Sequence, residues 1–337
     1  MATRLLIRPE LGPWAAQWDQ LVDLSRLPSP FLRSWWLTGT AGPRRHFVLV
    51  VQDDMLLGGL ALEERRRLGL PVFTMMGTGP LCPDHLDLLA GRGQEDPVIT
   101  SVSAWLRRQG TRILDLAGID AGSLLVNALP ARVLQEPLAV APWAALPADP
   151  DTYLAARPRG FRKTLRQASS RLAAEGANHR VNRGPAAIRS LSTLRQLHTA
   201  QWGRRSRFLP SFERFAAGCR LAAEVDEVAV HELARDESVI AIVVAFEVAG
   251  RISLYQSARL TDFRWRDATT LLLNAVIRDA CTRGFTEVDF LRGDEAYKNN
   301  FAPERRQLLR LRVTSGEFAR VMLMAETAAR KAKRAVT

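Results

Sequence analysis

The chain has 337 residues, enough for two domains of ordinary size, and it is 47% hydrophobic and 24% charged. No run approaches the ~20 apolar residues of a membrane span, no signal-peptide core is visible, and three dispersed cysteines fit neither a disulfide framework nor a metal site, so we expect a reducing cytoplasm. The net charge of +12 favours anionic partners but is weak support for nucleic acid, because codon bias would also enrich arginine over lysine.

The first 140 residues are expected to form one α/β unit. The N-terminal residues predict a strand, and Pro13 to Leu24 predicts a helix because its apolar residues recur at helical spacing. Phe31 to Trp36 is aromatic and predicts a short helix docked on the core. The remaining elements are expected as a hairpin at 47–52 and 56–63, a strand at 72–76, a helix at 97–109 and a strand at 113–117. The segment Gly77-Thr78-Gly79-Pro80 predicts a turn rather than a phosphate-binding loop.

Residues 141–152 are rich in proline and polar residues, which predicts a linker between two domains. A basic helix follows within residues 153–175, with Arg157, Arg159, Arg162, Lys163, Arg166 and Arg171. Two interpretations of this helix stay open. Its charges either form a solvated face or bind an anion at the rim of a cleft.

The second half predicts two helices and then a sheet. Helices are expected at 190–202 and 211–224, strands at 228–233, 238–246 and 251–258, a basic loop at 264–268, a helix at 269–282 and a strand at 288–291. A strand at 308–313 is expected to close this sheet, and residues 325–337 predict a basic helix that frays into disorder.

One stretch carries most of the chemistry. A short apolar strand around Asp289 breaks at Gly293 and then presents Asp294, Glu295, Tyr297 and Lys298 within five residues. A strand that ends in a glycine turn and leads into polar residues is how α/β folds build sites. Because Asp289 lies among apolar residues, we expect its carboxylate to be buried and partnered.

The order of these elements resembles the core of the GNAT acyltransferases. The sequence DFLRGDEAYK at 289–298 resembles the signature of the CelD-like (BioF2-like) acetyltransferase domain, which is related to the Fem-type peptidyl transferases. Leu197-His198 followed by Trp202, and the aromatic segment at 31–36, also resemble that family. The resemblance implies an α/β (α+β) fold of two tandem GNAT-like domains, each with a mixed, largely antiparallel sheet flanked by helices. Their expected bounds are 1–140 for a degenerate half, 141–152 for the linker, 153–320 for the acyltransferase domain and 321–337 for a basic tail.

The resemblance implies direct acyl transfer without a covalent intermediate. Tyr297 would then protonate the leaving thiolate, and Lys298 would neutralise the donor or the oxyanion. Asp289 would act either as the general base for the amine or as a structural acid paired with Arg292. His198 could be a base, although a histidine on an apolar helical face is more often a hydrogen-bonded core residue.

The resemblance also implies a pyrophosphate site at the start of the 269–282 helix and no permanently bound cofactor. The five histidines are dispersed and none is paired at ligand spacing, so no metal site is expected. The expected donor-binding residues are Arg264, Arg266, Asp267, Ala268, Thr269 and Thr270. GNAT loops usually carry glycine here, and this loop has none. Either guanidinium groups bind the pyrophosphate, or the donor is an acyl carrier protein or an aminoacyl-tRNA rather than free CoA.

The acceptor is expected to contact Gln256, Asp294, Arg292 and Trp202. Three functions stay open. The first is an N-acyltransferase that uses acyl-CoA or an acyl carrier protein as co-substrate and acts on a small amine, amino acid or peptide, as a monomer or homodimer. The second is a Fem-type aminoacyl transferase that uses tRNA, which the basic helix and the glycine-free loop favour. The third is a non-catalytic binding protein, which the joint presence of the residues at 289–298 disfavours.

Overall fold

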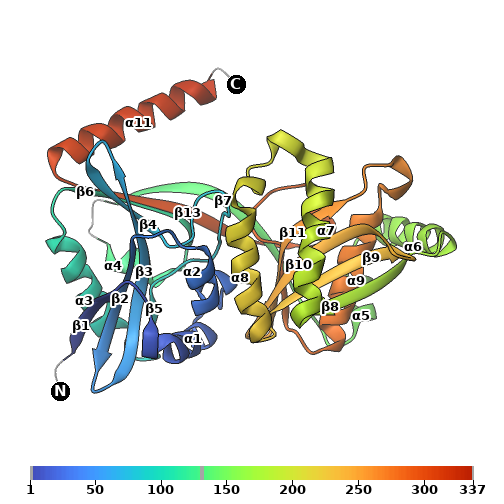
Figure 1. Ribbon diagram of the computed structural model, residues 1–337, viewed down its shortest axis with the longest axis horizontal. Helices are drawn as coiled ribbons and strands as arrows, with labels where there is room; N and C mark the ends of the chain where they lie inside the picture. Colours follow the sequence, from blue (N-terminus) through green and yellow to red (C-terminus); the bar gives the residue numbers. More distant parts are fainter. Residues whose placement is uncertain (1–2, 130–132, 336–337) are drawn as a thin grey trace. The chain divides into compact units, whose positions relative to one another are not determined.

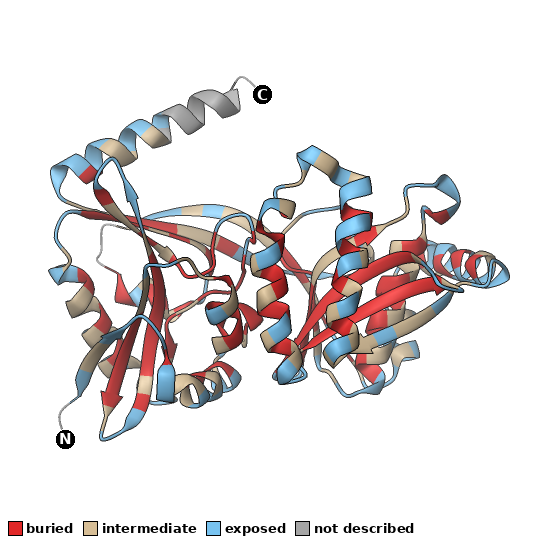
Figure 2. Cartoon of the chain, viewed as in Figure 1, coloured by how far each residue is buried: buried red, intermediate tan, exposed pale blue. Residues whose placement is uncertain are grey.

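The computed structural model describes residues 3–129 and 133–335 and divides into two compact units (Figure 1). The first unit contains Met1–Leu138 together with Gln307–Thr337, and the second contains Ala139–Arg306. Each unit is a mixed sheet flanked by helices. Figure 2 shows the strands largely buried and the outer faces of the helices exposed. No helix in the described part of the chain is long and apolar enough to cross a bilayer.

The first unit is built on a sheet in the order β1-β2-β3-β4-β6-β13, with β5 beside β3. Its strands are antiparallel except for the parallel pair β4 and β6. The strands are β1 (Arg4–Arg8), β2 (Arg45–Gln52), β3 (Met55–Arg67), β4 (Leu70–Met75), β5 (Leu89–Ala90), β6 (Arg112–Asp120) and β13 (Glu304–Ser315). Its helices are α1 (Ala15–Leu24), α2 (Ser34–Thr40), α3 (Glu95–Arg108), α4 (Leu124–Ala128) and α11 (Glu317–Ala335), with 3-10 turns η1 (Gly12–Trp14) and η2 (Pro30–Leu32).

The predicted elements of this unit are found close to their expected places, because the residue pattern that predicts each element lies within that element. Helix α1 buries one face, and its Trp18 indole donates to the Leu32 carbonyl at 2.7 Å. The aromatic segment forms η2 and α2, in which Phe31 and Trp36 meet edge to face with centroids 4.9 Å apart. The predicted 47–52 and 56–63 hairpin is the β2–β3 pair.

The segment expected as a linker is not a linker along its whole length. Residues 141–145 complete strand β7 (Leu134–Ala145), and Asp149 begins helix α5 (Pro150–Ala155) by accepting two main-chain N–H groups. Pro142 suggested a break, but a proline lacks only the N–H, and its carbonyl still accepts the N–H of Phe290 at 2.9 Å. The strand therefore tolerates the proline residues that made the segment resemble a linker.

The strand expected to close the second sheet pairs with β6 of the first unit. Residues 308–315 of β13 run antiparallel to β6, with Leu308 opposite Asp120 and Ser315 opposite Arg112. Arg310 binds the Asp115 carboxylate of β6 through two guanidinium nitrogens. Such long-range pairing is not encoded in any local pattern, so the expected domain bounds 153–320 and 321–337 differ from the observed units.

The C-terminal helix is longer than the predicted tail. Helix α11 begins at Glu317, and Ala319 packs with Leu70 and Ile113 in a small cluster of the first unit. Arg67 and Glu326 form an ion pair at 2.8 Å. The backbone is helical through Ala335, whereas residues 336–337 and the basic side chains near the end lie outside the described part.

The second unit has the strand order β7-β12-β11-β10-β9-β8. Its other strands are β8 (Asn178–Arg183), β9 (Val228–Arg235), β10 (Ser238–Val248), β11 (Arg251–Arg259) and β12 (Glu287–Asp289). Its other helices are α6 (Arg159–Ala174), α7 (Gly184–Trp202), α8 (Phe212–Glu224), α9 (Ala268–Thr282) and α10 (Lys298–Phe301), with 3-10 turns η3 (Gly203–Arg205), η4 (Leu209–Ser211) and η5 (Phe263–Trp265). Strand β8 was not predicted, because its sequence is polar and its burial does not alternate.

Helices cover both faces of the second sheet. Figure 1 shows α7 and α8 on one face and α9 on the other. The main core cluster lies on the α9 side, where Leu272, Val276 and Ile277 pack with Val243 of β10. Strand β10 is buried along nearly its whole length because both of its faces are covered. This core fixes the position of β11, from which the candidate site is built.

Candidate active site

Strands β11 and β12 run side by side only at their beginnings. Their parallel ladder pairs Arg251 with Glu287, Ile252 with Val288 and Ser253 with Asp289. Strand β12 then ends, whereas β11 continues to Arg259. Beyond Ser253 this edge of β11 has no ladder with β12, so its main-chain N–H and C=O groups can bond an extended ligand.

A β-bulge lies where the two strands part. The ladder between β10 and β11 skips Tyr255, which is therefore the extra residue of the bulge. A bulge bends its strand and re-aims the side chains around it. The residues of β11 also become more exposed at this place: residues 251–254 are buried, and residues 255–257 are half-buried. Gln256, one of the predicted substrate-binding residues, lies in this opening.

Asp289 at the end of β12 is fully buried and ion-paired. Arg251 Nη2 donates to its Oδ2 at 2.8 Å, and Arg306 Nη1 lies 3.5 Å from the same oxygen. Its Oδ1 accepts the main-chain N–H of Leu291 at 2.7 Å. Both arginines also bind Glu287. The expectation that this carboxylate is buried and partnered is confirmed.

The loop after β12 follows a constrained backbone path. Leu291 has φ +54°, a left-handed conformation that costs a β-carbon residue ~1–3 kcal/mol. Gly293 has φ +125°, and a Cβ placed there would lie 2.3 Å from the Glu295 carboxylate. Lys298 is 5% exposed, and its Nζ donates to the Arg292 carbonyl at 2.9 Å and binds Glu295 Oε2 at 2.9 Å. The lysine thus holds the loop in place.

Tyr297 follows this loop at the start of α10 and is 38% exposed. Within the described residues its phenol has no hydrogen-bond partner. Burial, with a smaller effect of the Glu295 carboxylate, raises the pKa of Tyr297 to about 12. At physiological pH the phenol is therefore neutral and able to donate a hydrogen bond.

Helix α9 starts a short distance after β11 and presents main-chain N–H groups. Its N-cap residue, Asp267, does not cap the helix with its side chain and binds Arg171 of α6 at 2.6 Å instead. The N–H groups of Ala268, Thr269 and Thr270 have no acceptor within the helix. Together with the helix dipole they form an arrangement that suits an anion.

The two predicted phosphate-binding arginines lie beside this helix start. Arg264 stacks over the buried Trp265 ring at 4.7 Å and lies 3.5 Å from Asp262. Arg266 lies over the Phe263 ring at 4.4 Å. Their side chains are 54% and 43% exposed, so these protein contacts are weak and leave both guanidinium groups accessible to a ligand.

His198 and Trp202 lie at the C-terminal end of α7. His198 is buried, with Nε2 2.9 Å from Ser206 Oγ, and burial lowers the pKa of His198 so that the ring is neutral at pH 7. Trp202 is 46% exposed. The end of α7 reaches the end of β11, where Gln201 Oε1 accepts the main-chain N–H of Arg259 at 3.3 Å.

Two other predicted residues are engaged in holding the loop. Asp294 forms an exposed ion pair with Arg305 at 2.6 Å. Arg292 is half-buried and contributes its carbonyl to Lys298. The structure thus gives both residues a role in the loop conformation.

Residues 159–299 match the family described as "Acetyltransferase (GNAT) domain". The chain carries a GNAT domain. No curated protein matches the sequence.

Solved structures resemble the whole chain and not only the GNAT domain. The C-terminal domain of a protein assigned as a lysylphosphatidylglycerol synthetase from Agrobacterium fabrum is 14% identical, with 94% of this chain and 96% of that chain covered and a TM-score of 0.62. FemX is 10% identical over 91% and 97%, with a TM-score of 0.61. A tandem GNAT protein from the clavulanic acid biosynthesis pathway is 12% identical over 94% and 99%, with a TM-score of 0.50. At these identities the likeness shows the fold, which is a tandem of two GNAT-like units.

The predicted residues of the GNAT domain fall into two groups along β11. Gln256 and the 289–298 loop lie where β11 and β12 part, and residues 264–270 lie at the start of α9, which follows β11 in the chain. His198 stands apart, since no hydrogen bond or ion pair in the described part of the chain links it to Tyr297. The family and the fold together indicate an acyltransferase.

Sequence reasoning missed three features of the GNAT domain. The end of the β11–β12 ladder and the bulge at Tyr255 depend on pairing, which single-strand patterns do not reveal. Arg251 and Arg306 were also missed as partners of Asp289. A signal for Arg251 did exist, because it is a charged residue at the start of a strand expected in the same sheet as the buried acid.

Proposed function

We propose that the chain is an N-acyltransferase that moves an acyl group from an acyl thioester, carried by CoA or an acyl carrier protein, directly to a primary amine of a small molecule, amino acid or peptide. The observation that carries the proposal is the parting of β11 and β12 beside the start of α9. Strand β11 offers an open edge there, and the start of α9, which follows β11 in the chain, offers an anion site.

The donor arm is expected to bind as an added strand. A pantetheine arm is extended and carries amide groups, so it can bond the open edge of β11 as a peptide would. Gln256 would contribute a side-chain hydrogen bond there. The N–H groups of residues 268–270, with Arg264 and Arg266, would bind the pyrophosphate.

The chemistry needs one net proton transfer. The amine nitrogen attacks the thioester carbonyl carbon, a C–N bond forms, and the C–S bond breaks. The proton lost by the amine is finally carried by the sulfur. Tyr297 is the proposed donor to the departing sulfur, because its phenol is neutral and without a partner among the described residues.

The other predicted catalytic residues receive more specific roles in this proposal. Asp289 and Lys298 are positioning residues, because the first is held by two arginines and the second binds the loop main chain. His198 remains the proposed base for the amine. Its ring is neutral at pH 7, as a base must be, and its Nδ1 is buried without a hydrogen-bond partner.

A CoA titration tests the donor site. We expect calorimetric binding of CoA at low salt, and we expect the Arg264→Ala, Arg266→Ala double variant to weaken it by ~10²-fold, since each charge-assisted contact is worth roughly 1.5–3 kcal/mol. In turnover the same variant should raise KM for the donor far more than KM for the acceptor. No heat at millimolar CoA would rule out free CoA as the donor.

A second candidate function is a Fem-type aminoacyl transferase that uses aminoacyl-tRNA. The glycine-free η5 turn and the basic helix α6 favour it. Its donor should bind through α6, so replacing Arg159, Arg162, Lys163 and Arg166 would matter more than replacing the two η5 arginines. The effect of the α6 substitutions on donor binding should become smaller as the salt concentration is raised, because phosphate contacts release counterions. A non-catalytic binding protein, the third alternative, would show no turnover with either donor.

A further inference from the structure

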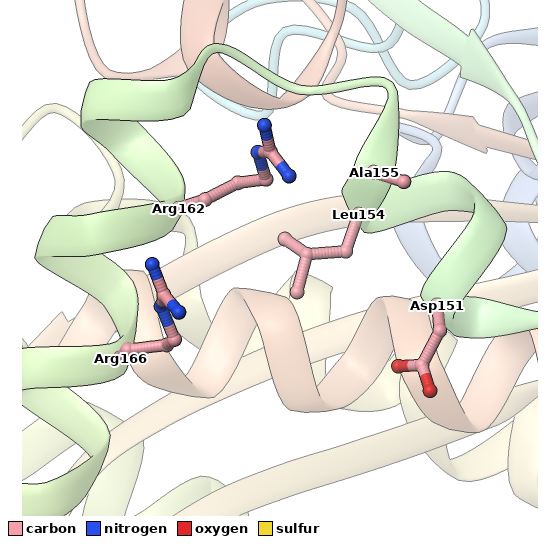
Figure 3. Close-up of a pocket in the computed structure, with 5 residues that line it drawn as sticks. All are labelled: Asp151, Leu154, Ala155, Arg162 and Arg166. Atoms are coloured by element: carbon pink, nitrogen blue, oxygen red, sulfur yellow. The ribbon is translucent and has the colours of Figure 1, made fainter.

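A second cationic site lies on helix α6, away from the start of α9. A cavity of about 260 Å³ is lined by Arg162 and Arg166 of α6 and by Asp151, Leu154 and Ala155 of α5. Figure 3 shows both arginine side chains leaving α6 toward the space beside α5, with Leu154 between the two helices. All of these residues belong to the second unit.

The charge of this cavity is positive and uncompensated. In the described part of the chain, neither Arg162 nor Arg166 has an ion-pair partner. Arg162 Nε is buried without a hydrogen-bond acceptor, which is costly in the absence of a ligand. Asp151, the one acid in the lining, is already bound to Arg278 at 2.6 Å. Two guanidinium groups are therefore left to bind an anion.

Helix geometry separates this cavity from the proposed donor site. Arg162 and Arg166 are one turn apart and lie within about 40° of each other around the axis. Arg171, which binds the N-cap residue of α9, lies about 140° from Arg166 on the other flank of α6. The buried residues Phe161 and Leu165 lie between the two flanks. A ligand at the start of α9 therefore does not explain why Arg162 and Arg166 lack ion-pair partners.

The size and lining of the cavity indicate the class of ligand. At about 260 Å³ it is smaller than the ≈ 300–1,000 Å³ of pockets that enclose whole ligands. It can hold one tetrahedral oxyanion and the group attached to it. Paired guanidinium groups suit phosphate oxygens, and Leu154 and Ala155 offer an apolar surface for the attached group.

We propose that the cavity between α5 and α6 is a binding site for a phosphate ester, in which Arg162 and Arg166 bind the phosphate and Leu154 packs against its organic substituent. The site is independent of the proposed transfer from an acyl thioester. Its ligand would be either a small phosphomonoester or one phosphate of a phosphodiester.

The test is calorimetry on the full chain with AMP, adenosine, inorganic phosphate and a short single-stranded RNA as probes. We expect AMP to bind more tightly than phosphate and adenosine not to bind. Arg162→Gln with Arg166→Gln should weaken AMP binding by about 100-fold. The matched control is Arg159→Gln with Lys163→Gln, which removes the same charge from the same helix but from residues that do not line the cavity. It should change AMP affinity by less than about threefold, and the melting temperatures of both variants should stay at the wild-type value.

Three results would overturn the proposal. Equal losses in the two double variants would mean that α6 attracts anions through net charge alone. Loss of AMP binding in Arg264→Gln with Arg266→Gln, but not in the cavity variant, would place the phosphate at α9. Equal affinity for adenosine and AMP would show that no phosphate is recognised. If the proposal holds, RNA that binds with the same dependence on Arg162 and Arg166 as AMP identifies a phosphodiester ligand, and AMP binding without RNA binding identifies a monoester.

Discussion

Single residues of the 289–298 stretch divide into those that hold the loop and one that faces outward. Asp289, Lys298 and Asp294 each have a charged partner, and Lys298 also binds the loop main chain. Within this stretch, Tyr297 alone presents a neutral donor, and its side chain is 38% exposed. The residues that look most reactive in the sequence therefore mostly set the position of the phenol.

Replacing Tyr297 by phenylalanine is expected to lower kcat by ~10²-fold or more while the fold is unchanged, because the change removes only the donor to the departing sulfur. Single-turnover kinetics with a thioester donor measure this effect. A donor whose leaving thiol has a lower pKa should lose less, since that thiolate needs no proton. Wild-type turnover by the variant would reduce Tyr297 to a packing role.

Replacing Asp289 by asparagine is expected to lower the free energy of unfolding by roughly 3–5 kcal/mol, because Arg251 would be left buried with one partner fewer. Urea unfolding measures the change. Asp294→Asn is the matched control, since it breaks an exposed pair and should cost at most ~1 kcal/mol. Similar losses for both variants would contradict the structural role of Asp289.

At the scale of elements, the predictions succeed where the signal is local and fail where it is shared between distant strands. Helix α9 and the basic turn before it were predicted because apolar periodicity and a glycine stop lie within the segment. The bulge at Tyr255 and the short ladder of β12 were not predictable, since they depend on which strand lies alongside. The same reason explains why the proline-containing β7 resembled a linker. The residues of the candidate site could thus be proposed from the sequence, whereas the geometry of the site could not.

The strand pair β8–β9 contains a pH-sensitive contact. His231 is fully buried, with Nδ1 3.1 Å from Nε2 of His179. Burial, with a smaller effect of His179, lowers the pKa of His231 from 6.5 to about 3. Because the unfolded chain binds this proton below pH ~6.5 and the folded chain does not, stability should fall as pH drops from 6.5 toward 3.

Between pH 7.5 and pH 4.5 this histidine should contribute a loss of about 3 kcal/mol. The measurement is urea unfolding at both pH values for the wild type and for His231→Asn. The variant is expected to be less stable at pH 7.5 but to lose less stability on acidification. Parallel pH profiles for the two proteins would show that His231 is not the group responsible.

At the scale of the whole molecule, the second unit is continuous in sequence and the first is not. The fragment 139–306 contains the β7 residues that pair with β12, namely Trp143, Ala144 and Ala145. The fragment 153–320, which the sequence alone suggests, lacks them and carries β13 without its partner β6. Domain boundaries are therefore the part of the fold that sequence patterns predicted least well.

We expect the fragment 139–306 to unfold cooperatively and to resist limited proteolysis, because the ladders that join β7, β12, β11, β10, β9 and β8 lie within the second unit. The fragment 153–320 should melt at a lower temperature and be cleaved within β13, whose N–H and C=O groups would be unpaired. Circular dichroism and mass spectrometry of the proteolysis products measure both. A higher melting temperature for 153–320 would contradict the observed division.

The place of β13 in the chain also sets the order in which the protein can be completed during its synthesis. Strand β6 cannot pair with residues 307–315 of β13 until the whole second unit has been synthesised. At ~5–20 residues per second, the 177 residues from 138 to 315 take about 9–35 s to translate. Throughout that interval the N-terminal unit carries an unpaired strand edge, so the half that is synthesised first is the half that matures last.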